Sequence, residues 1–347
     1  MRLNDAIQAA IQADIPVILW GAPGTGKTAA IQEAAGAMGA HLETLIGSQL
    51  DPTDVGGRPV VTENGELRQA APPWAMRIKQ ALDAGKQAWV FMDELSCAPP
   101  SVQASLLRVV AERCSADIDL SGCRMLAAAN PGDQAADGGE LALAMANRWA
   151  HFNWALDSEM FSAGLLGGWG NPDSSTHQAR AAVATYISRD ASALLVPPPA
   201  MSENIRGWAS PRSWTRLASA LAALGDSKTW LSKSGRELSV ALVGISASAS
   251  FSAWLSENNL PDPKEILDRK VSLPERGDLR MATLDSACAY ALAFSRISDF
   301  WGLLMEGRKD LRVASARRAL AAVEASGITM ESTPELVELA ALQRTLS

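Results

Sequence analysis

Several residue patterns that mark particular protein classes are scarce in this 347-residue chain. It has three histidines, and its four cysteines show no C-x-x-C spacing. We therefore expect neither a disulfide framework nor a zinc site. No stretch approaches about 18 consecutive apolar residues, and the N-terminus has no apolar signal core. We expect a cytoplasmic protein with reduced thiols and no membrane segment.

The composition is that of a globular protein, with 48% hydrophobic and 20% charged residues. The length predicts about two domains. The formal net charge of −7 argues against a surface built mainly to hold nucleic acid, although a local basic pore is compatible with an acidic average. Nucleic acid is therefore not favoured as a partner.

Residues 1–156 alternate short apolar runs with helical segments, after an opening amphipathic helix with apolar residues at Leu3, Ile7, Ala10 and Ile11. The strand candidates are 17–20, 88–92, 125–129 and 149–154. This alternation predicts an α/β domain with a parallel sheet flanked by helices. An insert at about 48–73 contains Asn64-Gly65 between β-favouring runs, which predicts a hairpin with a type I′ turn.

Residues 157–347 are rich in Ala, Leu and Ser and predict an all-α domain with extended C-terminal helices. Two interruptions are expected, at 164–175 and at the three prolines 197–199. Five tryptophans in this part are expected to anchor packing between helices, namely Trp208, Trp214, Trp230, Trp254 and Trp301.

A phosphate-binding loop follows the first apolar strand and fits G-x-x-x-x-G-K-[ST]. Its glycines let backbone N–H groups point at phosphate oxygens, and the helix that follows adds its positive end. Lys27 would reach the β- and γ-phosphates of ATP, and Thr28 would ligate Mg²⁺. The loop consists of Gly21, Ala22, Pro23, Gly24, Thr25, Gly26, Lys27 and Thr28.

Two further strands end in polar residues suited to the same site. Asp93 and Glu94 follow the apolar run 89–92, where Asp93 fits the Mg²⁺ shell and Glu94 fits the general base. Asn130 follows the run 125–129 and would contact the γ-phosphate and position the attacking water. Asn130-Pro131 also fits a simple turn.

These residues resemble the AAA+ ATPases, and within them the MoxR-like and dynein-related branch, over about residues 15–225. The resemblance implies a P-loop core followed by a helical lid. Ala146-Asn147-Arg148-Trp149 is similar to the family's arginine-finger motif, with Trp149 where Phe is usual, which makes Arg148 the expected finger for a neighbouring subunit. The insert at 48–73 is similar to one that faces a central pore or a partner.

The segment Ser210-Pro211-Arg212 is similar to the family's second sensor. Ser210 fits an N-cap and Pro211 the first helical position. Arg212 is the expected sensor, and Arg206 is a second candidate.

The resemblance implies an ATPase that uses ATP and Mg²⁺ in a homo-oligomeric ring, expected to be a hexamer. The expected activity is chaperone-like remodelling or activation of a protein client, such as one with a von Willebrand A-type domain. One alternative is a ring motor acting on nucleic acid in a restriction or defence system. A small-molecule kinase is a third, although it gives no reason for Asn130, Arg148 and Arg212 to stand where they do.

Overall fold

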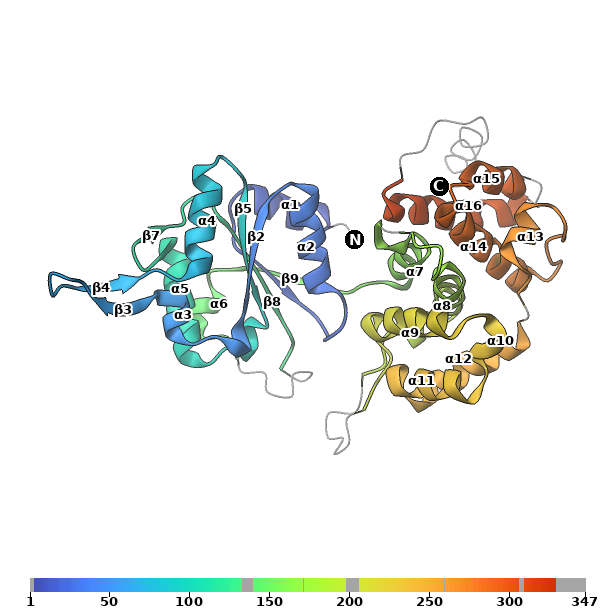
Figure 1. Cartoon of the computed structure of the whole chain (residues 1–347), viewed down its shortest axis with the longest axis horizontal. Coiled ribbons are helices and arrows are strands. Elements are labelled where there is room, and N and C mark those ends of the chain that lie inside the picture. Colours follow the sequence, from blue (N-terminus) through green and yellow to red (C-terminus); the bar gives the residue numbers. More distant parts are fainter. Residues whose placement is uncertain are drawn as a thin grey trace. The chain divides into compact units, whose positions relative to one another are not determined.

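The computed structural model describes residues 3–132, 140–170, 172–197, 206–258, 260–305 and 309–328. The chain forms two compact units, Met1–Ala155 and Leu156–Ser347 (Figure 1). This division lies one residue from the boundary expected from sequence. Within the described ranges, no helix combines the length and apolarity needed to cross a membrane.

A five-stranded parallel sheet forms the centre of the first unit. Its strand order is β2-β5-β8-β1-β9. The inner strands β5 and β8 are almost completely buried, because helices cover both faces of the sheet, and this explains their continuous apolar sequences. The predicted α/β fold is confirmed. The strands span β1 (Val17–Trp20), β2 (His41–Ile46), β5 (Ala88–Asp93), β8 (Arg124–Ala129) and β9 (Ala150–Asn153).

Two helical layers enclose this sheet (Figure 1). One face is covered by α1 (Asp5–Gln12) and α2 (Lys27–Ala37), and the predicted apolar positions of α1 are buried there. The other face is covered by α4 (Pro73–Asp83) and α5 (Pro100–Glu112). The shorter helices α3 (Pro52–Gly56) and α6 (Leu143–Ala146) pack on the same face. The sheet thus has one apolar core on each of its two faces.

The edge strand β2 was not among the predicted strands. It pairs with β5 in parallel register, from His41 opposite Ala88 to Ile46 opposite Asp93. Its sequence mixes polar and apolar residues, because only Glu43 and Leu45 are buried along it. Such a short mixed pattern does not stand out in a sequence.

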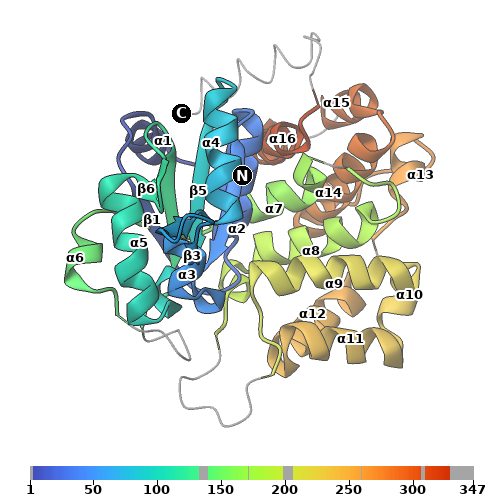
Figure 2. The ribbon, with the colours of Figure 1, turned by 60° about the vertical axis from the view of Figure 1, so that its left-hand side comes forward.

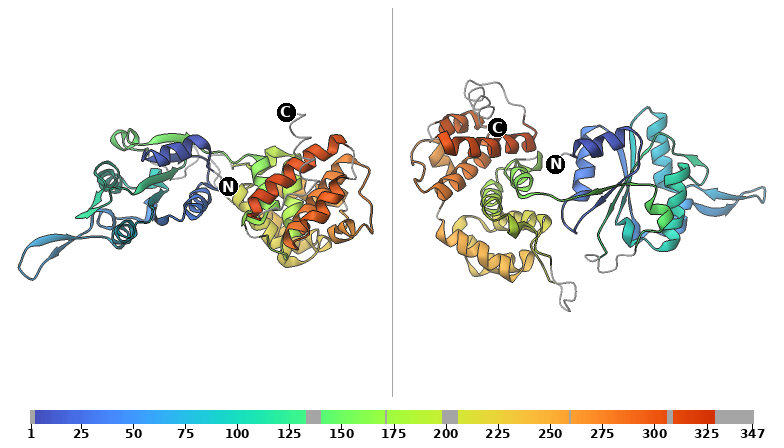
Figure 3. Two further views of the ribbon diagram at one scale, coloured as in Figure 1. Left: turned by 90° about the horizontal axis from the view of Figure 1, so that it is seen from above. Right: turned by 180° about the vertical axis from the view of Figure 1, so that it is seen from behind.

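The expected hairpin in the insert is present as β3 (Arg58–Val61) and β4 (Leu67–Ala70), which are paired antiparallel and exposed along their whole length. It projects away from the sheet (Figures 1 and 3). The predicted type I′ turn is wrong. Gly65 N–H donates to Thr62 O at 2.9 Å, and Gly65 has a positive φ of 79° whereas Asn64 does not, so the loop is a three-residue turn with a left-handed glycine. A second short ladder joins β6 (Cys114–Ser115) to β7 (Ile118–Asp119).

The described part of the second unit contains helices and no strand (Figures 2 and 3). Its central helix α8 packs against α7, α9, α12 and α14. The α-helices are α7 (Ser158–Leu166), α8 (His177–Arg189), α9 (Pro211–Leu224), α10 (Ser227–Trp230), α11 (Lys233–Val243), α12 (Ile245–Glu257), α13 (Pro263–Leu267), α14 (Gly277–Ala293), α15 (Ile297–Met305) and α16 (Lys309–Ser326). The 3₁₀ turns among the described residues are η1 (Gly47–Gln49), η2 (Leu95–Cys97), η3 (Gly168–Gly170) and η4 (Ala191–Leu194).

Aromatic side chains join these helices. Tyr186 on α8 lies 5.5 Å from Trp214 on α9 and 5.2 Å from Phe251 on α12, measured between ring centroids. Of the five tryptophans expected to anchor packing, Trp208 is half-buried and the others are buried. Aromatic burial of this kind supplies a large share of the apolar area of a helical core.

The interruption expected at 164–175 begins later than predicted. α7 continues to Leu166, so Gly164 is helical, and a Cβ at Gly164 would lie 2.2 Å from the ring of Trp169. Gly164 therefore serves close packing rather than a break. In the other expected interruption, Pro198 and Pro199 lie outside the described residues.

Candidate active site

The phosphate-binding loop lies between β1 and α2, as the sequence predicts. Gly24 and Gly26 have φ values of 80° and 86°, which L-residues with a side chain rarely adopt. Gly26 is the N-cap of α2, and Lys27 is its first residue. The first turn of α2 therefore presents its unpaired N–H groups and the positive end of the helix at this loop.

Lys27 and Asn130 are brought together at the carboxyl edge of the sheet. The Lys27 ammonium donates to Gly21 O at 2.6 Å, to Ala22 O at 3.0 Å and to Asn130 Oδ1 at 2.9 Å. Lys27 is only 8% exposed. The contact with Asn130 arises because β1 and β8 are neighbours, with Trp20 opposite Ala129, so that both strands end at the same level.

Thr28 and Asp93 meet beside this lysine. The Thr28 hydroxyl donates to Asp93 Oδ2 at 2.7 Å. A hydroxyl and a carboxylate at hydrogen-bonding distance are hard oxygen donors, which fit Mg²⁺ held jointly by protein and phosphate oxygens. In the described part of the chain no group of three His, Cys, Asp or Glu residues forms a metal cage of its own.

Glu94 has an unusual backbone conformation and a defined partner. Its φ of 54° places a side-chain-bearing residue in the left-handed region, a strain often found at functional sites. Its N–H donates to Asp93 Oδ1 at 3.0 Å, and its Oε2 accepts a hydrogen bond from Ser48 Oγ at 2.6 Å. The two carboxylates of the predicted pair are therefore held by different partners.

Sequence reasoning missed Ser48. It follows β2, which is hydrogen-bonded to β5, so the loop after β2 reaches the end of β5. Gly47 permits this approach, because a Cβ there would lie 2.8 Å from Glu94 O. Had β2 been recognised as the neighbour of β5, Ser48 could have been placed near Glu94.

Trp154 supports the phosphate-binding loop and was also missed. Its indole N–H donates to Thr25 O at 3.1 Å, and its backbone N–H donates to Trp20 O at 2.6 Å. Gly21 packs on the same residue, since a Cβ there would lie 2.4 Å from Trp154 O. The end of β9 therefore fixes the start of the loop.

Arg148 lies in the same unit, exposed, just after α6. Its guanidinium donates back to Ala144 O. No hydrogen bond or ion pair among the described residues joins it to Lys27, Asp93 or Glu94. Arg148 is thus placed on the surface of its own subunit.

His151 has two defined hydrogen-bond partners. Its Nδ1 accepts from the Trp20 indole N–H at 2.8 Å, so its Nε2 carries the proton and donates to Ala146 O at 2.8 Å. These two hydrogen bonds tie the segment before Arg148 to the end of β1.

Arg212 belongs to the second unit and is exposed in the first turn of α9. The predicted cap is present, because Ser210 Oγ accepts from Ser213 N–H at 3.2 Å and Pro211 is the first helical residue. Arg206, the second candidate for the sensor, is exposed and lines a cavity beside α11.

A comparison with known protein families finds a match within the first unit. Residues 16–145 match the family of AAA domains of the dynein-related subfamily. The chain is also similar to a solved structure of a RuvB mutant from Thermotoga maritima, with 13% sequence identity, a TM-score of 0.38, and coverage of 76% of this chain and 72% of that one.

Proposed function

We propose that this chain, which carries a dynein-related AAA domain at residues 16–145, hydrolyses ATP with Mg²⁺ to remodel or activate a partner protein. The observation that carries the proposal is one cluster of contacts. Lys27 Nζ lies 2.9 Å from Asn130 Oδ1, and Thr28 Oγ1 lies 2.7 Å from Asp93 Oδ2. All four residues lie at the same edge of the sheet. A lysine, an amide, a hydroxyl and a carboxylate in this order fit a bound nucleoside triphosphate.

Each of these residues has a role in the proposed reaction. The loop N–H groups and Lys27 would bind the β- and γ-phosphates, and Thr28 and Asp93 would hold Mg²⁺, which would supply positive charge to the phosphate oxygens. Asn130 orients the water that attacks the γ-phosphorus. As the bond from the γ-phosphorus to the bridging oxygen breaks, Glu94 accepts the proton of that water.

Arg148 and Arg212 complete the proposed site. The exposed Arg148 would enter the site of a neighbouring subunit in a ring, expected to be a hexamer, and stabilise charge on the transferred phosphoryl group. Arg212 would contact the γ-phosphate from the helical unit. Turnover would then depend on assembly, because a lone subunit lacks the arginine of its neighbour.

The proposed work on a partner protein is supported by the β3–β4 hairpin. Val61 and Leu67 on it are 71% and 72% exposed, although they are large apolar residues. An exposed apolar hairpin offers contact area to another protein. A client with a von Willebrand A-type domain is the proposed partner, and a cytoplasmic location is proposed with it.

The variant Glu94→Gln tests the proposal. It should bind a fluorescent ATP analogue with near-normal affinity and hydrolyse ATP about 10²- to 10⁴-fold more slowly, because the general base is lost. Glu112→Gln, which alters an exposed glutamate on α5, should hydrolyse at the normal rate. Near-normal hydrolysis by Glu94→Gln would remove Glu94 from the role of base.

Two further measurements test the ring and its client. The rate per chain should rise with protein concentration, and a rate independent of dilution would contradict a shared site. ATPase stimulation by a co-expressed partner protein supports the remodelling role, whereas stimulation by DNA alone would favour a motor acting on nucleic acid.

A further inference from the structure

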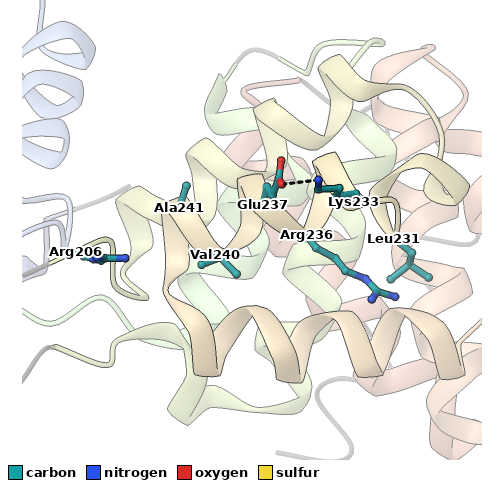
Figure 4. Close-up of a pocket in the computed structure, with 7 residues that line it drawn as sticks. All are labelled: Arg206, Leu231, Lys233, Arg236, Glu237, Val240 and Ala241. Carbon is teal, nitrogen blue, oxygen red and sulfur yellow. Dashed lines mark ion pairs between the residues drawn. The ribbon is translucent and has the colours of Figure 1, made fainter.

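A cavity of about 800 Å³ lies along α11 in the helical unit (Figure 4). Three of its lining side chains are cations, namely Arg206, Lys233 and Arg236. Arg206 lies at one end of the cavity and Arg236 near the other, with Val240 between them. Nothing in the proposed hydrolysis uses Lys233 or Arg236, so this surface needs another explanation.

The charge around this cavity is opposite to that of the whole protein. The lining of the cavity carries three cations and one carboxylate, whereas the whole chain has a net charge of −7. Glu237 is the one carboxylate in the lining. Its Oε1 lies 3.9 Å from Lys233 Nζ, and both side chains are largely exposed. Exposed pairs at such a distance bind weakly, so Lys233 remains available to another anion.

A second cavity of about 520 Å³ adjoins the first, since Arg206 and Val240 line both. Its lining includes Val196 and Ile245, which are 51% and 73% exposed. Together with Val240, at 40%, these make a concentration of large exposed apolar side chains beside the cations. Asp190 stands in the lining of the second cavity. The surface therefore offers cations in one part and apolar contacts in the adjoining part.

We propose that the two cavities bind an acidic, amphipathic segment of a partner protein. Its carboxylates would pair with Arg206, Lys233 and Arg236, and its apolar side chains would cover Val240 and Ile245. The assignment follows from charge complementarity combined with exposed apolar area. This docking surface deepens the proposed function by naming where a partner protein binds. Binding of the segment requires neither ATP nor its hydrolysis.

A protein segment fits this surface better than a nucleic acid does. Glu237 and Asp190 would repel a continuous row of phosphates. The lining has two aromatic residues, but Tyr186 is buried and Trp208 is half-buried, so neither offers an open face on which bases could stack. A peptide can place its carboxylates at the cations and its apolar residues elsewhere.

The test measures binding of a fluorescein-labelled peptide with the repeated sequence Glu-Leu-Glu-Glu-Leu to the full-length protein without nucleotide. The double variant Lys233→Glu/Arg236→Glu should weaken binding by about tenfold or more, and added salt should weaken the wild type. Val240→Asp should weaken binding through the apolar part. Lys264→Glu, which changes an exposed lysine on α13, should bind as the wild type does.

Several outcomes would overturn the docking surface. These are equal binding by the double variant, equal loss in Lys264→Glu, displacement of the peptide by oligothymidylate, or a change of oligomeric state in the double variant that identifies the surface as a contact between copies of this chain. The ATPase rate of each variant is recorded separately. Loss of peptide binding with a normal ATPase rate supports the docking surface alone, and peptide binding by a protein without ATPase activity contradicts only the proposed function.

Discussion

Ser48 Oγ donates a hydrogen bond to Oε2 of Glu94 at 2.6 Å, and so joins the loop after β2 to the carboxylate proposed as the general base. Glu94 stands in a left-handed backbone conformation just after β5, and Ser48 reaches its side chain from the loop after β2. The serine leaves Oε1 of the carboxylate available to a water molecule.

Removal of this bond should slow hydrolysis. We expect Ser48→Ala to lower kcat about tenfold with little change in KM, because a hydrogen bond to a charged group contributes about 1.5–3 kcal/mol and acts here on the base rather than on the nucleotide. Steady-state kinetics measure both constants. In the background of Glu94→Gln the same substitution should cause no further loss, and an additive loss would show that Ser48 acts elsewhere.

Arg148 can be tested by mixing two inactive variants. Arg148→Ala keeps its own nucleotide loop, and Lys27→Ala keeps its arginine, so each is expected to be inactive alone. In an equimolar random ring about one quarter of interfaces would combine an intact loop with an intact arginine, and ATPase activity should reappear. Phosphate release by the mixture is the measurement. A mixture as inactive as its components would contradict a finger supplied by a neighbour.

A buried ion pair holds α16 to the helical unit. Arg318 on α16 donates to Asp285 on α14, which also accepts from Thr185 Oγ1 on α8 at 3.0 Å. Burial raises the pKa of Asp285, although Arg318 and Thr185 favour its charged form. We expect Arg318→Met to lower the free energy of unfolding by about 3–5 kcal/mol, because it leaves a buried carboxylate without its partner.

The double variant Asp285→Leu/Arg318→Met should recover most of that loss, since both charges are removed. Arg317→Met, an exposed position one residue away on α16, should be nearly neutral. Urea unfolding followed by tryptophan fluorescence measures all four proteins. A double variant as unstable as Arg318→Met would show that the arginine acts by packing rather than by pairing.

The stability of the helical unit should fall at mildly acidic pH through His177. Burial lowers its pKa below the usual 6.5, which outweighs the hydrogen bond from its Nδ1 to Ser174 O. The unfolded chain therefore binds a proton more tightly than the folded one. The stabilising contribution is complete above about pH 6.5 and is lost as the pH falls, by at most about 1.4 kcal/mol per pH unit.

The variant His177→Phe should keep the ring contacts with Tyr290 and Phe294, whose centroids lie 5.3 Å and 5.7 Å away, and lose this pH dependence. Urea midpoints of wild type and variant between pH 8 and 5 give the comparison. Parallel curves for the two proteins would exclude His177 as the source.

The sequence predicted the inner part of the sheet well, because β1, β5 and β8 are buried on both faces and their apolar runs are unmistakable. It could not reveal β2, whose burial is one-sided and interrupted. Because β2 was not predicted, the proximity of Ser48 to Glu94 could not be predicted either. The turn at Gly65 was misassigned for a related reason, since Asn-Gly occurs in several turn types and the three-residue loop length is set by the hydrogen bond from Thr62 N–H to Glu66 O.

The sequence by itself determined the phosphate-binding loop, the carboxylates after β5 and the amide after β8, because each is a local pattern attached to a buried strand. Only the tertiary structure decided which of these side chains touch. The order β5-β8-β1 brings Asn130 to Lys27 and Asp93 to Thr28, and the ends of β2 and β9 bring Ser48 and Trp154 to the site. Contacts between strands depend on strand order and register, which no local pattern encodes.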